Sequence, residues 1–157
     1  MRRTVLLFAA AAFVSTGASA QNVGRAPAFG TLNLSAGFSD DPRNVNVTAG
    51  GQRNATGLGE GCVGSIADAP DVRVNYQAGQ FPLNFFVTAG EDTTLVINGP
   101  DGQWYCNDDT NGVNPVVTFA HPGSGQYDVY IGHYGQGAHI PAQLHVSEVS
   151  TGSGSGD

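Results

Sequence analysis

The stretch YDVYIGHY, residues 127–134, alternates side chains of different character along a run rich in aromatic and β-branched residues. Successive side chains of a β-strand point to opposite sides of the sheet. The stretch therefore predicts a strand with one face in the core and one face in water. The two sets are Tyr127, Val129 and Ile131 for the buried face, and Asp128, Tyr130 and Gly132 for the wet face.

Similar short runs recur along the chain, separated by clusters of Gly, Pro, Asn and Asp, and no long segment has helical periodicity. This spacing of short strands and turn signals is typical of an all-β fold, and it predicts an antiparallel β-sandwich. The expected strands cover residues 30–34, 45–49, 71–77, 82–88, 93–98, 103–106, 115–120, 127–134 and 142–149.

The two ends of the chain differ in composition from this region. Residues 1–20 combine two arginines, a short apolar core and a small-residue site, ASA, which together predict a signal peptide. We expect residues 21–28 to be a loose leader, 29–149 to be one domain, and 150–157 to be a flexible polar tail. The protein is therefore predicted to be secreted or periplasmic.

The mature chain is strongly acidic. Four arginines and thirteen acidic residues remain after residue 20, which gives a net charge of −9, and the chain contains no lysine. Such a chain repels phosphate backbones and anionic lipid head groups. This balance argues against nucleic acid as a partner and against membrane insertion after cleavage, and it favours cations.

Cys62 and Cys106 are the two cysteines. In an oxidising compartment, an even number of cysteines in a small exported domain predicts a disulfide. Two free thiols or a metal-binding pair remain the alternatives.

The segment WYCNDDTNG, residues 104–112, places carboxylates and amides next to Cys106 without a nearby cation. If 93–98 and 103–106 form a hairpin, Asp92 lies at the same end as residues 107–109, and Asp101 lies at the other end. Calcium takes oxygen ligands from Asp, Asn, backbone carbonyls and water, so this segment predicts a calcium site. The alternative is an Asn/Asp-rich turn that satisfies its own backbone. The candidate ligands are Asp92, Asn107, Asp108, Asp109 and Asn111.

Residues 92–134, DTTLVINGPDGQWYCNDDTNGVNPVVTFAHPGSGQYDVYIGHY, resemble the bacterial pre-peptidase C-terminal (PPC-like) domains, in a small stand-alone exported form. The shared features are a DT-L-containing strand and turn, the DD pair, and the later G-Y-D-V strand. The resemblance implies a jelly-roll-like sandwich without catalysis of its own, and calcium binding as in some members. By position it carries over Asp92, Asn107, Asp108 and Asp109.

Together these features predict a non-enzymatic, calcium-binding module that binds a protein or glycan at the cell surface or outside the cell. One alternative is a small secreted, peptidase-like hydrolase that uses Ser124 with one of the four histidines. Another is a surface protein that self-associates through open sheet edges. An aromatic face for sugars, formed by Trp104 and several tyrosines, is a further hypothesis; no residue pattern identifies the ligand.

Overall fold

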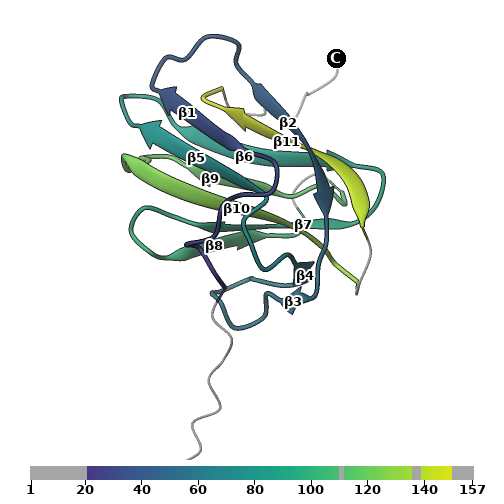
Figure 1. Cartoon of the computed structure of the whole chain (residues 1–157). Coiled ribbons are helices and arrows are strands. Elements are labelled where there is room, and N and C mark those ends of the chain that lie inside the picture. Colours follow the sequence, from purple (N-terminus) through teal and green to yellow (C-terminus); the bar gives the residue numbers. More distant parts are fainter. Residues whose placement is uncertain (1–20, 110–111, 136–138, 150–157) are drawn as a thin grey trace, which may run out of the picture.

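Residues 21–109, 112–135 and 139–149 are described by the computed structural model of the protein (Figure 1). Over these residues the chain forms eleven β-strands and no helix, so the predicted all-β fold is confirmed. A helix suited to crossing a membrane is accordingly not found in the described part of the chain. The predicted signal peptide, the predicted tail and Asn111 lie outside the described residues.

One sheet, called the β2 sheet below, contains four antiparallel strands in the order β2-β11-β6-β9. Strands that are distant in sequence are therefore neighbours in space (Figure 1). The bounds are β2 (Arg43–Ala49), β11 (Ile140–Ser147), β6 (Leu83–Ala89) and β9 (Val116–Phe119).

The second sheet is built around the long strand β10 (Gly125–His133) and is called the β10 sheet. Strands β5 (Val72–Gln77) and β7 (Thr93–Asn98) pair antiparallel with β10, and β8 (Trp104–Asn107) pairs with β7. Strand β1 (Thr31–Ser35) adds to β5 in parallel. Two short strands, β4 (Ser65–Ile66) and β3 (Arg53–Asn54), extend the sheet beside the end of β10.

The order β5-β10-β7-β8 in one sheet and β2-β11-β6-β9 in the other is the arrangement of an eight-stranded double-sheet jelly roll. All nine predicted strands are present, with ends within two residues of those expected. The two short strands β3 and β4 were not predicted, because they lie in a glycine-rich segment without strand periodicity.

The main core lies between the two sheets. It is formed by the inward-pointing Val, Ile, Leu, Phe and Tyr side chains of the long strands, and rings of Phe85, Phe119 and Tyr127 pack edge to face or tilted at its centre. Ring pairs in these arrangements contribute to stability beyond the area that they bury. This core is the product of the alternation that the sequence displays.

The outer face of β10 differs from the prediction. Asp128 is 2% exposed and Tyr130 is fully buried, so this face is not in water. The alternation correctly separates two faces, but other parts of the chain cover the second one. Residues 55–66 lie over Tyr130, and Arg73 pairs with Asp128 at 2.7 Å.

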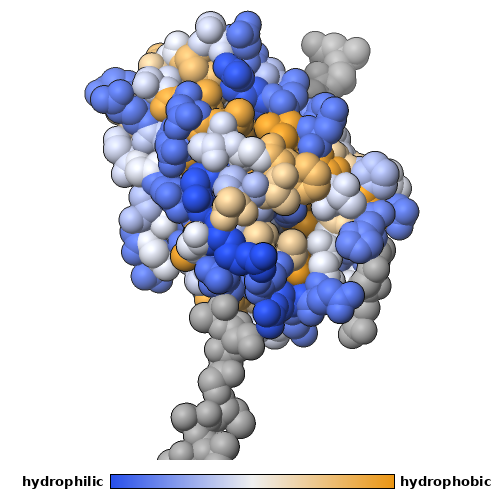
Figure 2. Space-filling model, viewed as in Figure 1, coloured by the Kyte–Doolittle hydropathy of each residue, from blue (hydrophilic) through white to orange (hydrophobic). Residues whose placement is uncertain are grey.

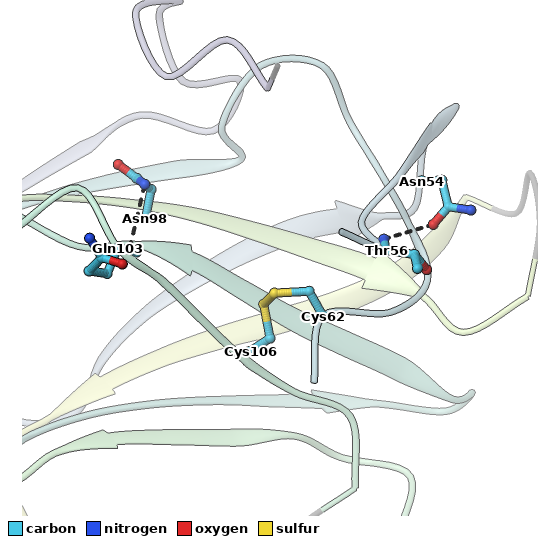
Figure 3. Close-up of a disulfide and its surroundings, with 6 residues drawn as sticks. All are labelled: Asn54, Thr56, Cys62, Asn98, Gln103 and Cys106. Carbon is cyan, nitrogen blue, oxygen red and sulfur yellow. Dashed lines mark hydrogen bonds between the residues drawn. A yellow bond between two sulfur atoms is a disulfide. The ribbon is translucent and has the colours of Figure 1, made fainter. Parts of the chain in front are cut away.

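The glycine-rich loop of residues 55–66 and the strands beneath it form a second core, which consists of Ala55, Cys62, Ile66, Val96 and Tyr130. The disulfide Cys62–Cys106, with a Cα–Cα distance of 4.9 Å, joins the loop to β8 (Figure 3) and confirms the predicted pairing. A Cβ atom at Gly64 would lie 2.7 Å from the carbonyl oxygen of His133, so glycine is needed for this close approach.

Residues 21–28, predicted to be a loose leader, are instead docked on the β10 sheet. Arg73 Nη2 donates hydrogen bonds to the carbonyls of Val23 (2.7 Å) and Arg25 (3.1 Å). Arg25 also pairs with Asp68 at 2.6 Å. Hydrophilic residues gather near β3 and β4 at the lower end of Figure 2, in the view of Figure 1. Polar contacts that the sequence pattern does not encode therefore fix this segment.

Candidate metal site

The β7–β8 hairpin positions the predicted carboxylates. Leu95 is the register partner of Asn107, so the chain on both sides of this pair continues to the same end of the sandwich. Asp92 precedes β7 there, and Asp108 and Asp109 follow β8. The hairpin expected from the sequence therefore brings these three residues, called the acidic end below, into one region.

Asp101 lies in the turn at the other end of the hairpin. Its carboxylate accepts hydrogen bonds from the Tyr105 hydroxyl (2.5 Å) and from the Gln103 backbone N–H (3.0 Å). These bonds lower the pKa of Asp101, with the Tyr105 bond contributing most. Asp101 is thus a turn residue whose carboxylate is satisfied.

Asp92 is in the opposite situation. Partial burial raises the pKa of its carboxyl, and the negative charges of Asp109 and Asp108 raise it further, while His133 lowers it. Its Oδ1 atom is buried and has no hydrogen-bond partner among the described residues. Carboxylates that crowd in this way repel each other more strongly as they lose water. The acidic end therefore brings several negative charges together and leaves the Oδ1 of Asp92 without a hydrogen-bond partner among the described residues.

Asn107 has a structural contact as well. Its Oδ1 accepts a hydrogen bond of 2.9 Å from the backbone N–H of Val116, which ties the end of β8 to the start of β9 on the opposite sheet. Asn111, the fifth predicted ligand, lies outside the described residues.

Two further polar residues lie at this end and were not predicted. Thr93 and His133 are register partners, and Thr93 Oγ1 and His133 Nδ1 are buried without a hydrogen-bond partner among the described residues. The backbone N–H of Tyr134 donates to the carbonyl of Asp92 at 3.2 Å. Nothing in the local sequence around His133 indicates this neighbour, because the pairing of β7 with β10 creates it.

The donor chemistry of the acidic end suits calcium, which binds carboxylate, amide and backbone oxygens together with water. The unpartnered Oδ1 of Asp92 is the atom that a cation would satisfy. Within the described residues, however, no group of three or more His, Cys, Asp and Glu side chains is arranged to hold a metal. The described side chains could therefore provide part of a coordination shell and do not form a closed cage.

The hydrolase alternative depends on Ser124. Its Oγ accepts a hydrogen bond of 2.9 Å from the backbone N–H of Ala78, and the residue immediately precedes β10. His145 is bonded elsewhere, to Asn44 at 2.7 Å and to Thr88 at 2.9 Å. None of the described histidines is hydrogen-bonded to Ser124, so the described residues do not assemble a Ser–His pair.

The aromatic residues considered for sugar binding are dispersed. Tyr127 is in the main core, Tyr130 is in the second core, and both are fully buried. Tyr134 is 56% exposed, whereas Trp104 and Tyr105 are half-buried. These side chains do not form the predicted aromatic face, because the β10 strand sends alternate tyrosines into different cores.

Comparisons with known proteins add little. No protein-family model and no curated protein matches the chain. A similar solved structure is a periplasmic lysozyme inhibitor of g-type lysozyme from Aeromonas hydrophila, at 14% identity and a TM-score of 0.42. The match covers 74% of this chain and 96% of the inhibitor. Similarity at this level does not indicate what the present chain binds.

Proposed function

We propose that the protein is an exported, non-enzymatic β-sandwich that acts as a binding or accessory module at the cell surface or outside the cell, with calcium at the acidic end. The sequence supports export through residues 1–20 and supports the module role through its resemblance to PPC-like domains. The observation that carries the calcium proposal is the crowded Asp92 carboxylate with its unpartnered Oδ1.

The proposed role of calcium is to stabilise the fold. Asp92, Asp108 and Asp109 would bind it, and Asn107 would contribute an amide oxygen. A cation there neutralises the repulsion between Asp92 and the carboxylates of Asp109 and Asp108. Because it binds the folded state, calcium at a hundredfold excess over its Kd adds about 2.7 kcal/mol to the free energy of unfolding.

A thermal melt of the mature, oxidised protein tests the proposal. We expect millimolar calcium to raise the Tm relative to chelator, and magnesium to have a smaller effect because it demands a tighter octahedral shell. Asp92→Asn, and Asp108→Asn combined with Asp109→Asn, should each abolish the calcium-dependent rise. The matched control is Asp101→Asn, which changes a carboxylate at the other end of the same hairpin.

Two outcomes would contradict calcium binding. The first is an identical Tm in chelator and in calcium for the unmodified protein. The second is a calcium-dependent rise that survives all three substitutions at the acidic end. Either result would leave residues 107–109 as an Asn/Asp-rich turn.

A further inference from the structure

The outer face of the β2 sheet contains no charged residue on its four strands. The side chains that alternate with the main-core residues point away from the core, and they are amides, hydroxyls, an imidazole and a few apolar groups. We call them the polar face, and its members are Asn44, Asn46, Thr48, Asn84, Phe86, Thr88, Val116, Thr118, Pro141, Gln143, His145 and Ser147. The chain carries thirteen acidic residues, and none of them lies on these four strands.

Side-chain hydrogen bonds hold this face in place. His145 Nδ1 lies 2.7 Å from Asn44 Oδ1, so it carries the proton, and His145 Nε2 accepts from Thr88 Oγ1 at 2.9 Å. Gln143 Nε2 donates to Asn46 Oδ1 at 2.8 Å in the next row. Groups fixed in this way lose little conformational entropy when a ligand binds.

An aromatic element lies within the same face. The rings of Phe86 and His145 are stacked, with centroids 4.5 Å apart and planes 10° from parallel. Burial lowers the pKa of His145, so its ring stays neutral near pH 7. The face thus combines an aromatic ring pair with neutral hydrogen-bond donors and acceptors.

The two outer faces of the sandwich differ in how far other segments of the chain cover them. On the β10 sheet, residues 55–66 and the docked segment 21–28 cover Tyr130 and Asp128. On the β2 sheet, Asn44, Asn46 and Thr88 are exposed, and no described segment covers them. The described part of the chain therefore leaves part of the polar face open, whereas its members Asn84 and Ser147 are buried.

We infer that the polar face docks a neutral polysaccharide, an inference that rests on the proposed role as a binding module and names its partner. Charge argues against charged polymers as the partner. An anionic polymer is repelled by the net charge of the chain, and a cationic one is drawn to the acidic end. A neutral, hydroxyl-rich chain exchanges hydrogen bonds with the amides and places its C–H groups against Phe86.

The test is affinity electrophoresis and calorimetry with soluble neutral polysaccharides, namely xyloglucan, galactomannan, glucomannan and dextran, with alginate as the acidic comparison. We expect at least one neutral polymer to bind. Phe86→Ala and Gln143→Ala should each weaken that binding about tenfold, the effect of losing one well-placed contact. If Phe86→Ala fails to fold, Thr88→Val at an exposed site replaces it as the test variant and should also weaken binding.

The matched control is Asn75→Ala on the other sheet. Asn75 donates to Asn33 at 2.9 Å in an exposed amide pair much like Gln143 and Asn46. Unchanged binding in this variant supports the polar face as the site. The inference is overturned if none of the neutral polysaccharides binds, if only alginate binds, or if Asn75→Ala weakens binding as much as Gln143→Ala.

Calcium separates this inference from the proposed function. A calcium-dependent Tm without polysaccharide binding overturns the polar-face inference alone. Polysaccharide binding that persists in chelator, together with a calcium-independent Tm, supports the inference and overturns the calcium proposal alone.

Discussion

The main core and the second core are built in different ways. The main core lies between two sheets, and its residues come from strands of four to nine residues with regular alternation. The second core lies on the outer face of the β10 sheet, beneath a glycine-rich loop whose only regular pieces are the two-residue strands β3 and β4. Long strands bury their faces by pairing and packing, whereas this loop is held by a covalent bond as well.

The cost of ordering explains the difference. Fixing a backbone residue costs about 1–2 kcal/mol of conformational entropy, and glycine loses the most. Ala55, Cys62 and Ile66 are the buried apolar residues that the loop contributes in return. The disulfide reduces the entropy of the unfolded chain, and so it offsets part of this cost. The sandwich should therefore tolerate changes that release the loop.

The largest effect is expected from removing the disulfide. Cys62→Ala with Cys106→Ala should lower the free energy of unfolding by about 2–4 kcal/mol, since the bond closes a long loop. Trp104 is the single tryptophan, and its ring centroid lies 5.8 Å from that of Tyr130. Its fluorescence therefore reports on the second core. Its fluorescence should change at lower denaturant than the far-ultraviolet circular dichroism of the sheets.

The unmodified, oxidised protein is the control, and there the two signals should change together. If they also coincide in the double variant, the second core unfolds with the sandwich and the proposed difference between the cores is wrong.

A smaller change in the free energy of unfolding is expected from pH, through Asp71, which contacts the main core. Asp71 is 2% exposed, and its Oδ2 accepts a hydrogen bond of 2.7 Å from the N–H of Ile131, a main-core residue. Burial raises the pKa of Asp71 to about 7, against the effect of that bond. The folded state therefore binds a proton that the unfolded state has lost. Stability should fall by about 2 kcal/mol from pH 5 to pH 7.

Asp71→Asn isolates this contribution from the other titrating groups. Its amide oxygen can still accept the bond from Ile131, but it does not ionise. Urea titrations at several pH values measure the free energy of unfolding of both proteins. The value for the variant minus the value for the unmodified protein should increase from pH 5 to pH 7. A difference that stays constant would show that Asp71 does not titrate there.

The smallest effect compares one tyrosine from each core. The Tyr127 hydroxyl donates to the carbonyl of Gly123 at 2.7 Å, whereas the Tyr130 hydroxyl is buried without a partner among the described residues. Tyr127→Phe should lower the free energy of unfolding by about 1 kcal/mol, because it removes a satisfied bond. Tyr130→Phe should be neutral or stabilising, because it removes an unsatisfied polar group.

Urea denaturation of both variants measures this difference, and each variant is the other's control. The opposite order, with Tyr130→Phe the more damaging, would mean that the Tyr130 hydroxyl has a partner.

Local pattern predicted much of the molecule. The alternation along 127–134 and eight similar runs identified the long strands, and the cysteine count predicted the Cys62–Cys106 bond. The NGPDG turn predicted the hairpin that brings Asp92 toward Asp108 and Asp109. The strands and the hairpin depend on residues that are close in the sequence. The disulfide was predictable because two cysteines can form only one intramolecular pair.

By itself, then, the sequence determined the strands, the sandwich class and the crosslink, because side-chain alternation and turn residues act over a few positions. Only the tertiary structure decided which outer face is covered, since Tyr130 and Asp128 are buried by segments distant in sequence. It also decided that residues 21–28 dock and that His133 lies beside Thr93. Alternation tells which residues share a face, but whether that face meets water depends on contacts between distant segments.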